Sequence, residues 1–131
     1  MLSIIIAGLI LISDQTLKAY LVKILLKDES ISVVQNIFHI TLVYNTGGAF
    51  GIFQNRTALF VAISVVAIIA IVLFYIKLKR QTLIYKIAIP LVLGGAVSNL
   101  IDRLRFGFVI DYLDFRVWPV FNIADACISA G

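Results

Sequence analysis

Residues 57–76, TALFVAISVVAIIAIVLFYI, form an apolar run that contains no charged side chain. A run of about 20 apolar residues is long enough to cross the hydrocarbon core of a bilayer as one helix. The rest of the chain agrees, because 62% of its 131 residues are hydrophobic and only 14% are charged, whereas soluble domains are roughly 45–50% apolar and 25% charged. The composition excludes a disordered chain, a disulfide scaffold and almost any soluble enzyme.

Two more stretches are long and apolar enough to span a bilayer. Residues 82–101 contain one charged side chain, Lys86, close to their start, where a lysine stem can reach the interface. Residues 2–26 are apolar in their first half, and their second half carries Asp14, Lys18 and Lys23. A fourth apolar helix begins at Asn122 but is too short here to cross. We therefore predict one membrane domain over residues 1–131, an all-α bundle of four transmembrane helices with the fourth incomplete.

The basic residues set the expected orientation. The connection 77–86 contains Lys77, Lys79, Arg80 and Lys86, and short loops rich in Lys and Arg stay in the cytoplasm. The N-terminus is then cytoplasmic as well, and residues 27–56 and 104–121 lie on the outer side. Residues 27–56 are rich in β-branched and aromatic side chains. Apolar and polar residues nearly alternate over 37–43, and turn-forming residues follow at 45–48. They predict a small β-element on the outer surface.

Polar side chains of the predicted spans gather at one depth. At about 1.5 Å per residue, Asp14 lies roughly 20 Å along the first helix, and Asn99 and Asp102 lie roughly 20 and 24 Å along the third. Asn122 and Asp125 fall in the first turn of the fourth helix, which starts on the outer side. Ionisable groups inside a membrane span are costly and indicate a functional site. We expect that site near the outer interface.

Several of these side chains also have structural explanations. Asp14 and Lys18 are spaced i, i+4 and can neutralise each other on one helix face. Asn122 is a good N-cap, and the helix dipole favours the negative charge of Asp125 in the first turn. These explanations stand beside the functional one.

Other residues are expected to be structural. Gly94 and Ser98 form a small-xxx-small pattern, which is typical of close helix packing. Tyr112 and Trp118 are expected to be interfacial aromatic residues between two outer helix ends, and His39 is expected at the surface or in the core of the β-element. The one His and the one Cys offer no cluster of metal ligands, so we predict no metal and no cofactor.

One pair of acids suggests a reaction. Asp111 lies in the apolar segment FGFVIDYLDF, and residues 112–121 contain a Trp-Pro step that can bring it back beside Asp125. Two carboxylates at one site do not both ionise easily, so one keeps its proton at neutral pH. Such a pair can activate water and protonate a carbonyl or an amine. By spacing alone, Asp102 and Asp114 are rival partners.

Other functions must be weighed against this one. Membrane carboxylates commonly form proton relays, so a small proton-conducting or transport subunit is the alternative, and a pure assembly protein is another. A relay predicts acids spread across the bilayer, whereas the inner halves of the predicted spans contain none. The net charge of +4 comes from basic residues at the ends of apolar runs, as in membrane proteins. We expect membrane lipid, and no nucleic acid, as a partner.

Five segments of the chain resemble the lipoprotein signal peptidases, also called signal peptidase II. They are SDQTLK at 13–18, YNTGGAFGIF at 44–53, GGAVSNLIDR at 94–103, VIDYLDF at 109–115 and FNIADA at 121–126. Each segment alone is weak evidence, but five segments in family order over nearly the whole chain are highly specific. Ser98 stands where the family commonly has Gly, a change of one small residue for another that should fit a tight helix contact.

The resemblance implies both a fold and a reaction. The fold has four transmembrane helices with both termini in the cytoplasm, a small extracytoplasmic β-cradle and an active site near the outer leaflet of the bacterial cytoplasmic (inner) membrane. The reaction is that of an aspartic endopeptidase, which removes the signal peptide from bacterial prolipoproteins. It cleaves just before the diacylglyceryl-modified cysteine.

The resemblance also implies roles for individual residues. The family's catalytic dyad falls on Asp111 and Asp125, so Asp102 becomes a supporting group instead of a catalytic partner. The substrate-binding or supporting residues of the family fall on Asp14, Lys18, Asn45, Asn99, Asp102, Arg103 and Asn122.

Overall fold

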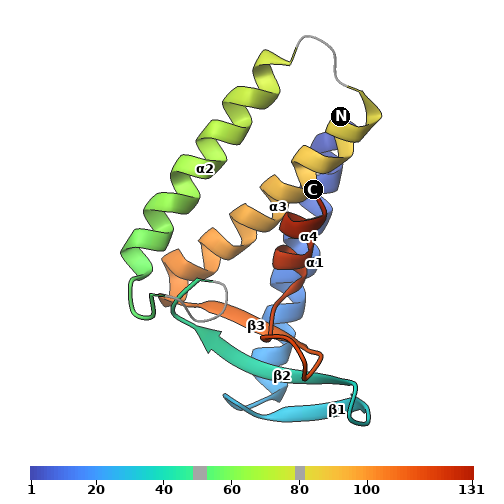
Figure 1. Cartoon of the computed structure of the whole chain (residues 1–131), viewed down its shortest axis with the longest axis vertical. Coiled ribbons are helices and arrows are strands. Elements are labelled where there is room, and N and C mark those ends of the chain that lie inside the picture. Colours follow the sequence, from blue (N-terminus) through green and yellow to red (C-terminus); the bar gives the residue numbers. More distant parts are fainter. Residues whose placement is uncertain (49–52, 79–81) are drawn as a thin grey trace.

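The computed structural model describes residues 1–48, 53–78 and 82–131. Within these residues the elements follow one another as shown in Figure 1: α1 (Leu2–Ile24), β1 (Ser30–Val34), β2 (Phe38–Asn45), α2 (Thr57–Lys77), α3 (Leu83–Phe106), β3 (Val109–Asp114) and α4 (Ile123–Ala130). The helices α1, α2 and α3 are each long and apolar enough to cross a membrane, which confirms the three predicted spans. Part of the segment YNTGGAFGIF, residues 49–52, and two basic residues of the predicted cytoplasmic connection, Lys79 and Arg80, lie outside the described residues.

Helix α2 leans away from the other helices and packs chiefly on α3 (Figure 1). None of its residues is buried within the protein, although its sequence is apolar on every face. A helix that is apolar all round belongs in an apolar surrounding, so lipid covers most of α2. At its first turn the Thr57 hydroxyl donates a hydrogen bond to the Gly107 carbonyl (2.5 Å), which fastens α2 to the end of α3.

Helix α3 is the centre of the bundle and runs further than predicted. It continues past residue 101 to Phe106, so Asp102 and Arg103 lie inside its last turns, and it ends at Gly107 with φ of 81°, a left-handed conformation that favours glycine. One face of α3 is buried against α1 and α4. That face includes Pro90, Gly94, Ser98 and Asp102, which are spaced four residues apart and therefore share one side of the helix.

Two glycines allow this close packing. A Cβ atom on Gly94 would lie 2.9 Å from the carbonyl oxygen of Ala7 in α1, which confirms the predicted packing role of this residue. A Cβ atom on the next residue, Gly95, would collide with the carbonyl oxygen of Ala124 in α4. The pair of glycines therefore lets α3 contact α1 and the beginning of α4 at the same level.

The sheet lies across the ends of α1 and α3 (Figure 1). Its three strands are antiparallel in the order β1-β2-β3. Strands β1 and β2 lie within residues 27–56, where a β-element was predicted. The third strand is a difference from the prediction, which places residues 104–121 in an outer loop. The segment VIDYLD supplies it, and it pairs with β2 so that Val43 lies opposite Asp111.

A small apolar core joins the sheet to α1. Its buried side chains are Leu21, Leu25, Leu42, Ile110 and Tyr112. Burial of each leucine contributes roughly 1.5–3 kcal/mol, so the sheet is held firmly on the end of α1. This core places strand β3 beside the last turns of α3.

Candidate active site

Strand β3 and the first turn of α4 place Asp111 and Asp125 in the wall of one cavity of about 1050 Å³. The chain reverses between them as predicted, since Phe121 and Leu113 exchange backbone hydrogen bonds (2.7 and 3.1 Å). Asn122 caps α4: its side-chain oxygen accepts from the N–H of Asp125 (2.8 Å), and the Asp125 carboxylate accepts from the N–H of Asn122 (3.3 Å). The predicted N-cap is confirmed.

Two asparagines connect the carboxyl groups. Asn122 Nδ2 donates to Asp111 Oδ1 (2.7 Å) and to the side-chain oxygen of Asn99 (3.1 Å). Asn99 Nδ2 in turn donates to Asp125 Oδ1 (2.8 Å). The second oxygen of Asp111 accepts from Asn45 Nδ2 (3.0 Å). Amide side chains from β2, α3 and the α4 N-cap thus hold both acids in position, and each of the three was predicted as a supporting residue.

Burial decides the protonation of Asp111, whose side chain is 2% exposed. Burial first, and the nearby charge of Asp125 second, raise the pKa of the Asp111 carboxyl to about 7. Hydrogen bonds from Asn45 and Asn122 and the charge of Lys18 oppose this rise. Near neutral pH, Asp111 can therefore hold a proton and give it up, as a general acid must.

Behind the two asparagines lies a buried ion cluster. The Lys18 ammonium is 2.7 Å from Asp14 Oδ2 and 2.7 Å from Asp102 Oδ2, and it donates to Asn99 Oδ1 (3.1 Å). All three charged side chains are almost completely buried. The three ammonium protons are thereby used, and the amide oxygen of Asn99 must face Lys18. Its NH₂ group is then directed to Asp125. The predicted neutralisation of Asp14 by Lys18 is confirmed, with Asp102 as a further partner.

Sequence reasoning missed three members of this cluster. Tyr112, expected at the interface, is fully buried, because it faces the side of β3 opposite to Asp111 and packs there in the apolar core with Leu21 and Leu42. Its hydroxyl donates to Asp14 Oδ1 (3.0 Å) and accepts from the N–H of Ile123 (3.2 Å), so it joins α1 to the start of α4. A strand prediction for residues 109–114 would have revealed this alternation.

The other two are Gln15 and Ser98. Ser98 donates to Asp14 Oδ2 (2.6 Å), and Gln15 Nε2 donates to the Ser98 hydroxyl (3.0 Å) and to Asp102 Oδ1 (2.8 Å). The serine therefore does more than fit a tight contact, since it satisfies a buried carboxylate. Gln15 could have been recognised from the sequence, because it is a polar residue inside a predicted span and is adjacent to Asp14.

Arg103 is half-buried in the wall of the cavity. It donates to the Gly47 carbonyl (3.2 Å), and its guanidinium lies 5.3 Å from the centre of the Phe60 ring in α2. Arg103 is next to Asp102 in the chain but does not contact it; the two point to different sides of α3, as adjacent helix residues do. Its charge is directed toward the cavity from the end of α3.

The rival acids lie elsewhere. Asp102 belongs to the buried ion cluster. Asp114 accepts from the Thr41 hydroxyl (2.7 Å) and the N–H of Arg116 (2.8 Å), away from the cavity. His39, expected at the surface or in the core, is partly exposed on the sheet and accepts from Arg116 at Nδ1 (2.8 Å). Trp118 is more than half exposed and lines the cavity mouth.

Comparison with known sequences gives a consistent result. Residues 6–131 match the family model described as signal peptidase (SPase) II. The lipoprotein signal peptidase of Halothermothrix orenii is 42% identical over 123 residues, which cover 94% of this chain and 84% of that protein. The lipoprotein signal peptidase of Brevibacillus brevis is 44% identical over 128 residues, which cover 96% of this chain and 86% of that protein.

Two solved structures of a bacterial membrane enzyme, obtained by the in meso method, share this fold. One superimposes with a TM-score of 0.93 and 34% identity over 98% of this chain and 80% of that chain. The other gives a TM-score of 0.89 and 34% identity over 98% and 85% of the two chains. The four-helix arrangement with its small sheet is therefore an established fold of a membrane enzyme.

Proposed function

Because this chain belongs to the signal peptidase II family, it is a membrane peptidase that removes the signal peptide from prolipoproteins, and we propose that Asp111 and Asp125 are its catalytic pair. One observation carries the proposal: the two acids line one cavity and are linked through Asn122 and Asn99.

The proton-conducting alternative is not favoured. The family is one of peptidases. The buried acids Asp14 and Asp102 share one cation, Lys18, which is linked through Asn99 to Asp125, so the acids form one cluster instead of a path through the bundle.

The two acids take different roles in this mechanism. Burial raises the pKa of the Asp125 carboxyl as well, but the Asn122 N–H and the Asn99 amide donate to its oxygens at the N-terminus of α4 and oppose that rise, so we assign Asp125 as the ionised member. It accepts a proton from a water molecule, which attacks the scissile carbonyl. Asp111, whose pKa is raised to about 7, is the protonated member. It donates its proton to the oxyanion that forms. The C–N bond then breaks as Asp125 passes the proton it took from water to the leaving amine, and one hydroxyl of the intermediate returns a proton to Asp111. The peptidase is thus an aspartic endopeptidase.

The substrate reaches this pair from the membrane. The bond cleaved is the one just before the diacylglyceryl-modified cysteine, and the acyl chains of that cysteine lie in lipid-facing grooves between the helices. Arg103 contacts the substrate backbone from the cavity wall. The whole chain acts as one integral membrane domain. Its positively charged 77–86 connection faces the cytoplasm, and its cavity lies near the outer leaflet of the bacterial cytoplasmic membrane.

A cleavage assay tests this function. We expect the purified protein in lipid vesicles to cut a diacylglyceryl-modified prolipoprotein just before the modified cysteine and to leave the unmodified precursor intact. Mass spectrometry of the products locates the cut. Proton flux across the same vesicles, measured with an internal pH dye, should equal that of empty vesicles. Flux without cleavage would support the relay and reject the peptidase.

The pH profile tests the role of Asp111. Its proton is present below pH 7 and is lost as the pH rises through its pKa of about 7, so kcat/KM should fall on the alkaline side of neutrality. Asn45→Ala removes a donor that favours the ionised carboxylate. The pKa of Asp111 then rises, and the alkaline limb should move to higher pH.

The control for this experiment lies on the same strand. Thr41 donates to Asp114 in the way that Asn45 donates to Asp111. Thr41→Ala should therefore leave the alkaline limb where it is in the wild type. A limb that stays fixed in Asn45→Ala, or that moves to lower pH, would show that Asp111 is not the proton donor.

A further inference from the structure

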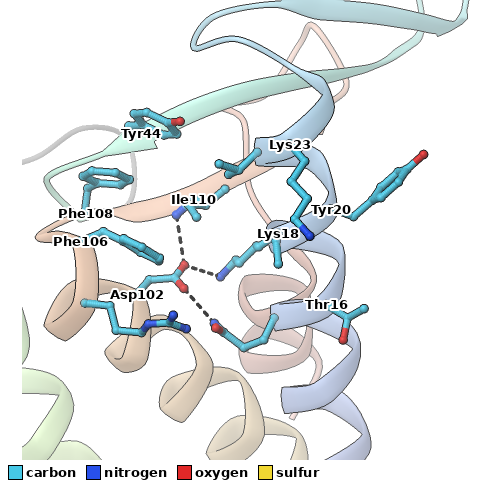
Figure 2. Close-up of a pocket in the computed structure, with 13 residues that line it drawn as sticks. Thr16, Lys18, Tyr20, Lys23, Tyr44, Asp102, Phe106, Phe108 and Ile110 are labelled. Atoms are coloured by element: carbon cyan, nitrogen blue, oxygen red, sulfur yellow. Dashed lines mark hydrogen bonds and ion pairs between the residues drawn. The ribbon is translucent and has the colours of Figure 1, made fainter.

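A second cavity, of about 800 Å³, lies between α1 and α3 at the end of the bundle that carries the sheet (Figure 2). It is distinct from the cavity of the two acids, since among the described residues Tyr44 alone lines both. Its inner wall is formed by Lys18 and Asp102 of the buried ion cluster. The proposed peptidase mechanism does not use this cavity.

Two basic side chains stand at its rim. Lys23 is in the last turn of α1 and Arg105 in the last turn of α3, and both are exposed. Figure 2 shows the Lys23 side chain lying along α1 toward the level of Lys18. Within residues 1–48, 53–78 and 82–131, neither Lys23 nor Arg105 forms a salt bridge. Arg105 instead lies 5.2 Å over the Phe106 ring. Both charges are available to an anion.

The inner wall holds one ammonium, Lys18, against two carboxylates, Asp14 and Asp102, and each of these groups is already paired within the protein. Asp102 accepts from Gln15, from Lys18 and from the N–H of Ile110 (2.8, 2.7 and 3.1 Å), as the dashed lines in Figure 2 show. Its carboxylate is therefore satisfied by donors within the protein. Counting Lys18, Lys23 and Arg105 against Asp14 and Asp102 leaves one net positive charge. A phosphodiester carries one negative charge and would neutralise it.

The remaining walls are apolar and aromatic. Tyr44 stacks on Phe108 with ring centres 4.4 Å apart, and Phe106 follows at 5.8 Å from Phe108. On the opposite wall, Val22 and Tyr20 belong to α1, and the Tyr20 side chain points away from the protein (Figure 2). Because α1 and α3 are both long and apolar enough to span the membrane, a ligand in this cavity has hydrocarbon beside it. A soluble anion would gain nothing from these walls, but acyl chains would.

We propose that this second cavity binds an anionic phospholipid, with its phosphate between Lys23 and Arg105 and its acyl chains along α1 and α3. Basic pockets between transmembrane helices near the interface are suited to such headgroups. The ligand is not the lipid of the substrate, because a diacylglyceryl group on cysteine carries no phosphate. The site is therefore additional to the cavity of the catalytic pair.

Native mass spectrometry of the purified protein in detergent tests the proposal. Phosphatidylglycerol and phosphatidylcholine are offered at equal mole ratio, and we expect the protein to retain the anionic lipid. Lys23→Gln with Arg105→Gln should reduce that retention by about tenfold, since each basic residue near a headgroup contributes to its binding. The matched control, Lys77→Gln with Lys86→Gln, removes two exposed charges at the other end of the helices and should retain the lipid within about twofold of the wild type.

The outcomes separate clearly. Circular dichroism and size-exclusion chromatography should match the wild type in all variants, because the four substituted side chains are exposed. Equal retention of the two lipids, or wild-type retention by the Lys23 and Arg105 double variant, would overturn the proposal. Soluble glycerol 3-phosphate should not displace phosphatidylglycerol at equal concentration. Displacement would identify a site for free phosphate compounds and would also overturn it.

Discussion

Replacing either Asp111 or Asp125 by Asn should reduce the cleavage rate by at least about a thousandfold while the protein stays folded. Asparagine keeps the size of the side chain but can neither carry the proton nor accept one from water, and acid–base groups contribute about 10²- to 10⁴-fold each. Both positions line the same cavity. The rate can be followed by chromatography of a lipid-modified peptide, with circular dichroism to monitor folding.

The matched control is Asp114→Asn, on the same strand as Asp111. Its carboxylate contacts Thr41 and Arg116 outside the cavity, so the rate should stay within a few-fold of the wild type. Substantial cleavage by a folded Asp111→Asn or Asp125→Asn variant would reject the proposed pair. A loss in Asp114→Asn as large as in the other two would instead point to a general loss of structure at the sheet.

The second large effect concerns stability. Lys18→Met should lower the free energy of unfolding by about 3–5 kcal/mol, because it leaves Asp14 and Asp102 buried without their common cation. Cleavage should fall too, since Asn99 loses one of the two donors, Lys18 and Asn122, that hold its amide oxygen and so direct its NH₂ group to Asp125. Thermal unfolding in detergent micelles measures the first effect, and the peptide assay measures the second.

Two further variants interpret this result. Lys23→Met, on the same helix but exposed, should change stability by no more than about 0.5 kcal/mol. Adding Asp102→Asn to Lys18→Met removes one of the stranded charges and should recover part of the loss, as coupled residues do. If Lys18→Met unfolds at the same temperature as Lys23→Met, the ion cluster contributes little to stability.

The membrane fold could be predicted to a large extent. The uncharged run over residues 57–76 became α2 almost residue for residue, because a lipid-exposed helix is determined by its own composition and length. The end of α3 was predicted less well, since Asp102 and Arg103 look like the polar limit of a span. They lie inside the helix because their side chains find partners in α1 and in the loop after β2.

The candidate site was predicted in part. The N-cap at Asn122 and the pairing of Asp14 with Lys18 follow from types and spacings of residues. Spacing left Asp102 and Asp114 as rivals in the acid pair, and only the family resemblance selected Asp111 and Asp125. The burial of Tyr112 and the outward position of Asp114 did not follow. Both depend on residues 109–114 being a strand, which in turn depends on pairing with β2. Strand pairing is a contact between segments that are distant in the sequence, so the local pattern of residues predicts it poorly.

The amino-acid sequence by itself determined that the chain lies in a membrane, which segments span it and which acids are candidates for a reaction, because these properties depend on hydrophobicity and residue type along a continuous segment. Only the tertiary structure decided that Asp111 and Asp125 share a cavity while Asp102 and Asp114 do not. The physical reason is that a carboxyl group acquires its role from the donors and charges that surround it. In this protein the donors and charges belong to α1, α3, β2 and the N-cap of α4, which are far apart in the chain.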